Sequence, residues 1–326
     1  MSYRKLQAFV TSLGSCMVLV LSATCLAEEG GSGHYQPGSM SSFADGVSAT
    51  PMFLTRLNVV NYDGEFDRGK PLPIAGITAL NAEAKATAVA LGVAWAPEWG
   101  KLNDSWQFQM AATVPVLSMK VSADVATSTQ RGSATVRRSD TETALGDIVL
   151  QPIMFNQNFS PDFNINYRVS LYAPTGSYKL GRLANTGKNY WTIEPMVAFM
   201  YFGQKNGREA SIYVGADFNE ENSDTHYKTG TQVHIDSTFA QHFPLWNGVV
   251  GAGVTAYWYQ QIKGDSGSGA NFGDFKGRTN GVGPVLSYVG QINKRKLVAE
   301  FRWMHEYGVE NRLSGDTAYV KVMYFL

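Results

Sequence analysis

The side chains best suited to acid–base or metal chemistry in this sequence are five histidines: His34, His226, His234, His242 and His305. No two of them have the spacing of a zinc site on a helix. His234 and His242 are too far apart to share one metal if they lie along a single strand. The only cysteines, Cys16 and Cys25, fall within the first 27 residues. We therefore expect no metal and no cofactor.

A serine at residue 266 is a second candidate for chemistry. It stands in the phrase GDSG, residues 264–267, which also surrounds the nucleophile of trypsin-like proteases. Here SGAN follows, and no histidine stands in a matching context. Because such a serine needs a base to activate it, the phrase does not predict a protease. Its Gly- and Ser-rich surroundings favour a flexible loop.

Composition limits the classes of partner. The chain has 326 residues, with 27 basic and 27 acidic side chains. Phosphate binding needs a basic surface, so this balance argues against a nucleic-acid partner. A hydrophobic content of 44% argues against a disordered chain, while 33 glycines and 12% aromatic residues favour strands joined by tight turns.

Residues 1–27 are expected to be a secretory signal peptide. A short basic start precedes an apolar stretch over 8–25, and Ala27 completes a small-residue cleavage pattern before Glu28. An N-terminal anchor helix is the alternative, but the apolar stretch is short for a membrane span. The phrase LGSC within it loosely resembles a lipoprotein signal, although apolar residues continue past it.

Beyond residue 50, apolar and polar residues alternate with the period of a half-buried strand. In NINYRVSLYAPTG, residues 164–176, Ile165, Tyr167 and Val169 alternate with Asn166 and Arg168. About twelve such runs occur, near 51–63, 80–96, 104–121, 143–156, 161–173, 189–202, 208–219, 230–243, 248–263, 277–290, 295–306 and 315–326.

The connections between these runs alternate in length. Short turns contain PEWGKLN, QNFSP, GQKNG, PLWN and QINKRK, and longer polar loops are expected at 64–79, 122–142, 174–188, 220–229, 264–276 and 307–314. No later apolar stretch could span a membrane as a helix, and lipid then leaves a closed barrel as the spanning structure. Residues 51–326 therefore predict an all-β fold, a single antiparallel transmembrane β-barrel of about 12 strands with short periplasmic turns. The alternative is a soluble secreted β-sandwich.

This prediction implies an exported protein in the outer membrane of a Gram-negative bacterium. Its partners would be the lipid bilayer and the barrel-assembly machinery. The polar strand faces would then line a wet lumen, with charges at Arg168, Glu194, Asp217, His234, Asp236, Glu300 and Arg302. Opposite charges inside a barrel usually pair across the wall or hold a plug, and a role in substrate contact is the alternative. The mixture of signs argues against strong ion selectivity.

Tyrosines on the inward faces are candidate contacts for a solute: Tyr172, Tyr190, Tyr213, Tyr257 and Tyr259. Aromatic walls with polar tips suit planar apolar ligands that carry a hydroxyl. An equally weighted interpretation is that these rings pack a plug, for which inward glycines at 251, 253, 281 and 283 leave space. The Gly- and Ser-rich segment 28–50 is the candidate plug, expected at or inside the periplasmic mouth.

Several longer phrases resemble one family over nearly all of the chain after residue 27. They are GGSGHYQPG (30–38), GDIVLQP (146–152), YAPTGSY (172–178), GRLANTGKNYW (181–191), FNEENSDTHYKTG (218–230), GDSGSGANFGDFKGR (264–278) and GVGP (281–284). These resemble the meta-pathway phenol-degradation family, the SphA-like outer-membrane proteins. The resemblance implies an outer-membrane barrel, commonly called a transporter, associated with the use of aromatic or other apolar compounds. It brings no settled set of functional residues.

We therefore expect a channel for passive uptake of small hydrophobic, aromatic or phenol-like compounds that feed a catabolic pathway. The alternatives are a lipase- or deacylase-like barrel enzyme and a structural barrel. Outer-membrane phospholipases carry Ser and His on the lipid-facing side, and both Ser237 and His305 are predicted to face outward. These two residues lie three strands apart, so an interfacial histidine is favoured over an enzyme.

Overall fold

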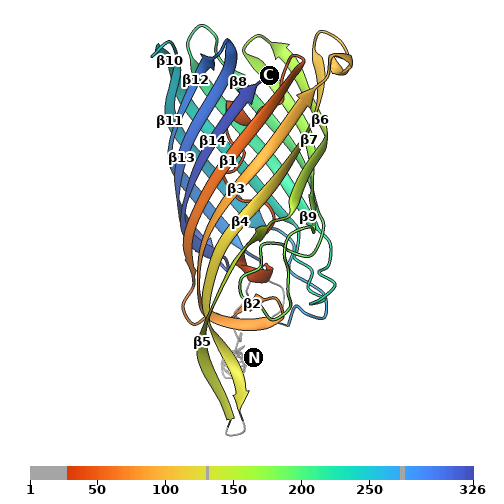
Figure 1. The fold of residues 1–326 in the computed structure, drawn as a ribbon, viewed down its shortest axis with the longest axis vertical. Coiled ribbons are helices and arrows are strands. Elements are labelled where there is room, and N and C mark those ends of the chain that lie inside the picture. Colours follow the sequence, from red (N-terminus) through yellow and green to blue (C-terminus); the bar gives the residue numbers. More distant parts are fainter. Residues whose placement is uncertain (1–27, 130–131, 272–275) are drawn as a thin grey trace, which may run out of the picture.

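The computed structural model describes residues 28–129, 132–271 and 276–326, and the expected signal peptide lies outside these ranges. Twelve antiparallel strands close into one barrel (Figure 1). They are β1 (Met52–Phe66), β3 (Ile77–Ala96), β4 (Trp106–Thr129), β6 (Ile148–Ser160), β7 (Phe163–Ala173), β8 (Thr192–Phe202), β9 (Arg208–Asn219), β10 (Gln232–Leu245), β11 (Gly248–Gln261), β12 (Arg278–Ile292), β13 (Arg295–Glu310) and β14 (Leu313–Phe325). The predicted twelve-stranded barrel is confirmed.

The first and last barrel strands pair with each other and so close the sheet. Strand β1 pairs with β3 on one side and with β14 on the other, with Val59 opposite both Val89 and Val320. A closed sheet leaves no edge, so the strands satisfy one another's backbone groups without water.

The period-two pattern separates lipid-facing from lumen-facing side chains. On β7, Asn166 and Ser170 are 0% exposed inside the barrel, while Ile165 and Val169 are partly exposed outside it. The same alternation places the outward tryptophans Trp95, Trp191, Trp258 and Trp303 on the surface, each about two-fifths exposed. Indole rings favour the membrane–water boundary, so the tryptophans near strand ends are in positions typical of interfacial anchors.

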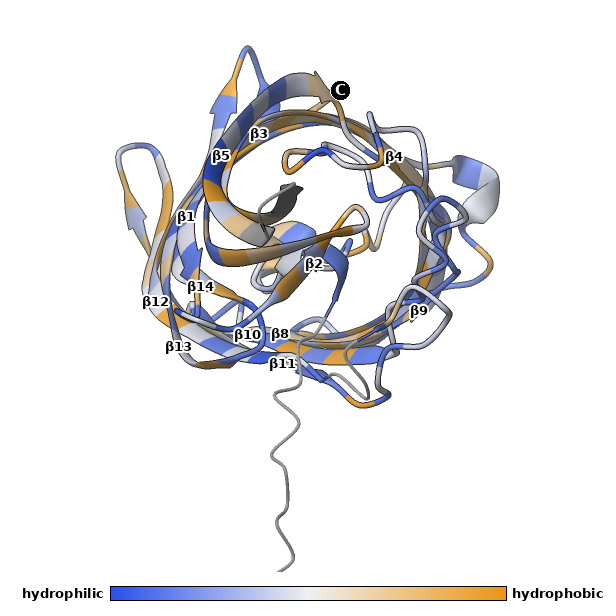
Figure 2. Cartoon of the chain, turned by 90° about the horizontal axis from the view of Figure 1, so that it is seen from below, coloured by the Kyte–Doolittle hydropathy of each residue, from blue (hydrophilic) through white to orange (hydrophobic). Residues whose placement is uncertain are grey.

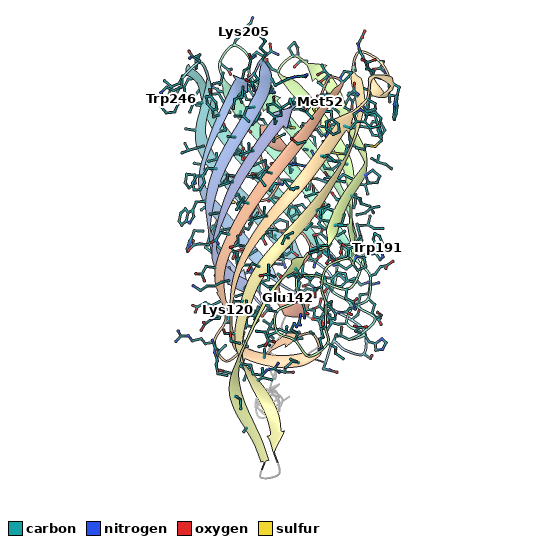
Figure 3. All side chains as sticks on the ribbon, viewed as in Figure 1. Met52, Lys120, Glu142, Trp191, Lys205 and Trp246 are labelled. Carbon is teal, nitrogen blue, oxygen red and sulfur yellow. The ribbon has the colours of Figure 1, made fainter. Side chains whose placement is uncertain are left out.

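The two ends of the barrel differ as predicted. Met52, Lys205 and Trp246 lie at one end, among the short turns, whereas Trp191 and Lys120 lie in the other half (Figure 3). The turn residues Trp246 and Asn247 have φ values of 54° and 59°, as a two-residue type I′ hairpin turn requires. In outer-membrane barrels such short turns face the periplasm and the long loops face outward.

The expected loop at 122–142 is wrong. Strand β4 continues to Thr129 and pairs with β5 (Gly132–Leu145), forming a hairpin that projects beyond the barrel at the long-loop end (Figure 1). The strand expected at 143–156 accordingly begins later, as β6. Because the hairpin leaves the membrane, both of its faces can be polar, and the apolar alternation used to find strands is lost there.

A second correction concerns 307–314, expected to be a long loop. Strands β13 and β14 extend until only two residues, 311 and 312, connect them. A further short strand, β2 (Leu72–Ile74), pairs with the start of β3 and lies across the mouth seen from the loop end (Figure 2). In the ranges that the structure describes, the helical elements are single 3-10 turns, η2 (Glu29–Gly31), η3 (Phe43–Asp45) and η4 (Glu98–Gly100). Nowhere in the described ranges is a helix sufficiently long and apolar to traverse a membrane.

The assignment of faces gives a first prediction. Phe239 lies midway along β10 and is 55% exposed on the outer surface. Phe239→Arg should cost about 2–4 kcal/mol of folding free energy in lipid, because the charge would sit near the bilayer midplane. Leu245→Arg, at the turn end of the same strand, should cost about 0–1 kcal/mol. Equal costs in unfolding titrations from liposomes would contradict the assignment of depth.

Candidate functional site in the lumen and the barrel wall

The lumen is occupied by the N-terminal segment, residues 28–50. At the long-loop end, the backbone N–H of Glu28 donates to Asp265 at 3.0 Å. Near the short turns, the N–H of Val47 donates to Asn166 at 2.6 Å, and that of Ser48 donates to Gln109 at 2.9 Å. The sequence predicts a position at or inside the periplasmic mouth. In the structure the segment runs the length of the lumen instead. It reaches the far end because side chains on the wall bind its backbone along the way.

A buried charge cluster binds the middle of the segment. Asp45, which is 3% exposed, forms ion pairs with Lys321 and with Arg302, the latter at 3.5 Å. Arg302 also donates to the carbonyl of Gly38 at 2.7 Å and pairs with Glu300 at 3.0 Å. Arg302 and Glu300, two charges predicted to be lumenal, therefore belong to this cluster. Its other members, Lys321 of the wall and Asp45 of the segment, were not predicted from the sequence.

A second cluster surrounds His234. Its Nδ1 lies 2.8 Å from Asp236, and its Nε2 lies 3.1 Å from Glu194. The ring of Tyr35, in the segment, stacks on the imidazole with centroids 3.7 Å apart, and its hydroxyl donates to Asp236 at 2.9 Å. Asp217 is buried nearby, yet neither of its carboxylate oxygens has a hydrogen-bond partner among the described residues.

Four of the five predicted tyrosines bind the segment or the wall through their hydroxyls, and that of Tyr172 donates to Glu194 at 3.0 Å. That of Tyr213 donates to the carbonyl of Ser42 at 2.8 Å, and that of Tyr259 donates to Glu28 at 2.6 Å. That of Tyr257 donates to Glu306 at 2.7 Å. The opposite position, Gly281, makes room for Tyr257, because a Cβ there would lie 2.3 Å from its ring.

Two of the five tyrosines contact His34 of the segment through their rings. Tyr172 stacks on its imidazole at 5.2 Å, and Tyr190 meets it edge-on at 4.9 Å. Arg168 donates to the carbonyl of Asp45 at 2.7 Å. All the site residues predicted from the sequence are thus buried inside the barrel, and the tyrosine rings are covered by the segment in this arrangement.

The loop that contains GDSG is an anchor for the start of the segment. Asp265 accepts hydrogen bonds from Tyr227, from the N–H of Gly230 at 2.8 Å and from Gln261 at 2.5 Å, besides the one from Glu28. Arg312 contacts both carboxylate oxygens of Glu28 at 2.5 Å. Sequence reasoning missed this anchor, since no periodic pattern links residues so far apart in the chain.

The stability that Asp265 contributes to this anchor depends on pH. Burial raises the pKa of Asp265 to about 6, although hydrogen bonds from Tyr227, Gly230 and Gln261 lower it. In the unfolded chain the pKa of this carboxyl is about 3.9. Between about pH 4 and 6 the carboxyl is therefore protonated in the folded protein and ionised in the unfolded chain. The contribution of this carboxyl to stability is therefore greatest below about pH 4 and is lost as the pH rises to about 6. Hydrogen exchange in the 220–231 loop should be slower at pH 4 than at pH 7 after correction for intrinsic rates, and Asp265→Asn should abolish the difference.

A chain of contacts at the loop end looks like a catalytic triad but is oriented differently. His34 lies 2.7 Å from the Thr192 hydroxyl and 2.9 Å from Asp147. Thr192 is 0% exposed, and its hydroxyl already donates to Asn219 at 2.6 Å, so it cannot also donate its proton to His34. These contacts fix the segment and do not form a nucleophile–base pair.

Ser237 and His305, the two lipid-facing residues considered as an enzyme site in the sequence analysis, do not lie together in the structure. Ser237 on β10 donates to the carbonyl of Ala256, while His305 on β13 pairs with Asp316 at 2.9 Å. Strands β11 and β12 lie between them. The two side chains therefore cannot act as one catalytic unit.

The barrel wall is interrupted between β8 and β9. Ile193 pairs with Phe218 and Met196 pairs with Gly215, but the two intervening rungs, at Glu194 and Pro195, are missing. Proline lacks the N–H that a ladder needs, and it is rare away from sheet edges and bulges for this reason.

A cavity of about 480 Å³ lies at this gap. Most of its lining comes from outward apolar side chains, including Pro195, Val214, Val233 and Trp258. Inward-facing residues of the lumen, among them Arg168, Met196 and His234, also reach it. Pro284 interrupts the β12–β13 ladder in a similar way, so the cavity, and not the proline alone, distinguishes the β8–β9 position.

The fold has a counterpart among solved structures. The crystal structure of the COG4313 outer membrane channel from Pseudomonas putida F1 is similar with a TM-score of 0.63 and 12% identity, covering 90% of this chain and 100% of that chain. The CymD monoaromatic hydrocarbon channel covers 84% of this chain and 88% of its own at 7% identity, with a TM-score of only 0.42. At these identities the first comparison shows the fold, that of an outer-membrane barrel. No curated protein matches the sequence.

A family model extends over most of the barrel. The model described as "Putative MetA-pathway of phenol degradation" matches residues 72–322. This range runs from β2 into β14 and includes the predicted lumen residues, the gap at Pro195 and the Asp265 anchor. The chain belongs to this phenol-degradation family.

Proposed function

We propose that the protein admits small hydrophobic compounds, aromatic ones in particular, across the outer membrane, and that they leave the barrel sideways at the gap beside Pro195. The observation that carries this proposal is the apolar cavity of about 480 Å³ where two rungs of the ladder are missing. The family to which the chain belongs supports phenol-like compounds as the substrate class.

The filled lumen favours hydrophobic over hydrophilic cargo. The segment 28–50 is held along its length by charged and hydrogen-bonded contacts, including those of Asp45, His34 and Glu28. A water-soluble solute would have to displace these contacts to cross. A hydrophobic solute needs only to reach the wall, because the surrounding bilayer is itself a favourable solvent for it.

The cavity is suited to an aromatic solute in size and in chemistry. Its volume lies within the roughly 300–1,000 Å³ of typical small-molecule pockets. Its lining includes the aromatic residues Trp258 and Tyr167 and the apolar residues Pro195, Val214 and Ala216. An aromatic pair adds about 0.5–1.5 kcal/mol beyond area burial, which gives a weak hold from which the solute can leave.

The tyrosines Tyr257 and Tyr259 would contact a solute only after the segment has moved. Replacing both with alanine separates the two roles proposed for them. If they bind the solute, uptake of dilute aromatic compound should fall at normal protein abundance. If they only hold the segment, leakage of a small sugar should rise while aromatic uptake is kept, and the binding role fails.

The proposed function is tested by uptake in intact cells. Cells that lack the protein should take up a dilute radiolabelled monoaromatic compound more slowly than wild type, and a concentrated one at the wild-type rate. A hydrophilic solute of similar mass should enter both strains equally. Equal uptake of the dilute aromatic compound by both strains would refute the proposal.

A further inference from the structure

We propose that Glu194, Asp217 and His234 bind a divalent transition-metal cation of the zinc class on the lumenal side of the wall gap. One ligand atom from each residue lies within 4.8 Å of the other two. The three side chains come from adjacent strands, β8, β9 and β10, and they are 0%, 2% and 0% exposed. Ligands bound to one ion at about 2.0–2.2 Å lie no more than about 4.4 Å apart, so the three side chains need only a small closing movement to converge on it.

The unsatisfied carboxylate of Asp217 points to a missing cation. Both of its oxygens are buried without a hydrogen-bond partner in the described structure. The charged groups that act on it most strongly are Glu194, His234, Glu28 and Asp236, three of them acidic. A buried carboxylate without compensation is costly, and like charges that face each other across a sheet repel. A divalent ion between Glu194 and Asp217 would remove both penalties.

His234 is held in the orientation that a metal ligand requires. Its Nδ1 lies 2.8 Å from Asp236, and Asp236 is itself fixed by Tyr35 and by the N–H of Gly38. When Nδ1 donates to a carboxylate, the lone pair of Nε2 is free for a metal. Gly215 clears the space for the ring, because a Cβ there would lie 2.3 Å from Nε2.

A second supporting contact orients Glu194. Tyr172 donates its hydroxyl to Oε2 of Glu194 at 3.0 Å, while the other oxygen, Oε1, faces His234 at 3.1 Å. The two ligands are thus each held by an outer partner, as in built metal sites. A donor set of one imidazole and two carboxylates suits Zn²⁺ and similar ions, whereas Ca²⁺ and Mg²⁺ prefer oxygen ligands alone.

The position suggests what the ion does. Glu194 and Asp217 lie opposite each other in one of the two rungs that the β8–β9 ladder lacks. An ion shared with His234 would join β8 to β9 where the ladder lacks its rungs, and would tie both strands to β10. The inference concerns binding alone and does not depend on the proposed route for the solute, because it is tested in detergent without any solute.

The test is metal binding by the full protein, purified from the outer membrane without a histidine tag. Zn²⁺ titration at pH 7.5 should give about one saturable site per chain. Asp217→Asn and Glu194→Gln should each weaken the affinity by more than about tenfold, and Asp236→Asn by about 10–100-fold, the range seen for outer partners of a ligand. Co²⁺ bound at the site should show a visible absorption spectrum that Zn²⁺ abolishes.

Glu209→Gln is the matched control. Glu209 is also a buried lumenal carboxylate and pairs with His242 at 2.8 Å, but the described residues provide no third His, Cys or carboxylate ligand beside this pair. This variant should bind Zn²⁺ as wild type does, and excess Ca²⁺ should not displace the ion. Each variant is first shown to be folded by its heat-dependent migration on a gel. Absence of a saturable site in the wild type, or undiminished binding by folded Asp217→Asn or Glu194→Gln protein, would overturn the proposal.

Discussion

Deletion of residues 31–46 should raise the flux of small hydrophilic solutes through the reconstituted protein by about tenfold or more, because a twelve-stranded barrel without its filling encloses a water-accessible lumen. The deleted stretch supplies Tyr35, Gly38 and Asp45, which together contact Asp236 and Arg302 on the wall. Liposome swelling with a series of sugars measures the effect.

A control deletion separates this result from general damage. The control removes residues 126–135; Ala126 pairs with Thr135 in the β4–β5 hairpin, whose described residues project away from the barrel (Figure 1). This deletion should leave sugar flux at the wild-type level. If deletion of 31–46 also leaves the flux unchanged, while the protein remains folded, the segment does not close the lumen.

The second large effect is expected from Arg302→Ala. Arg302 is 1% exposed and compensates Asp45 and Glu300, so its removal leaves these buried carboxylates with Lys321 and the more distant Arg56, 3.8 Å from Asp45. Breaking a buried pair on one side typically costs about 3–5 kcal/mol. The free energy of unfolding should fall by about 3 kcal/mol or more, and the segment should become sensitive to protease at lower denaturant concentration.

The matched control for Arg302 is Arg278, which pairs with Glu310 at 2.6 Å. Those two side chains are 48% and 52% exposed. Because a surface pair contributes only about 0–1 kcal/mol, Arg278→Ala should scarcely change stability. Similar losses for the two variants would mean that the charges around Asp45 are not what holds the segment.

Most of the barrel could be predicted from the sequence because its strands obey a single rule. Lipid on one side and the lumen on the other impose a period of two, so the inward position of Arg168, Glu194 and Asp236 follows from counting along each strand. The short turns could be located from their polar residues and glycines alone. Pro195 lies inside the strand predicted at 189–202. A proline shows that one backbone donor is absent, but it does not predict a cavity in the barrel wall at that position.

The parts that sequence reasoning missed do not follow that rule. Both faces of β5 carry polar side chains, such as Thr141 on one and Glu142 on the other, so its alternation carries no apolar signal. The segment 28–50 has no regular structure beyond two short turns, and its position depends on partners far along the chain, such as Asp265 and Arg312. The convergence of Glu194, Asp217 and His234 depends on strand register, which was not assigned from the sequence.

A disulfide across the β8–β9 gap tests whether hydrophobic solutes leave the barrel through this part of the wall. Pro195 and Ala216 lie opposite each other in the missing rungs, so Pro195→Cys with Ala216→Cys can be joined by a disulfide across the gap. Phe199→Cys with Ile212→Cys joins the same strands where the ladder is intact. The measurement is uptake of a dilute radiolabelled monoaromatic compound by cells that carry each pair, oxidised and then reduced. If solutes leave by this route, oxidation should stop uptake only in the gap pair, and reduction should restore it. Unchanged uptake with the gap disulfide formed would contradict the lateral route.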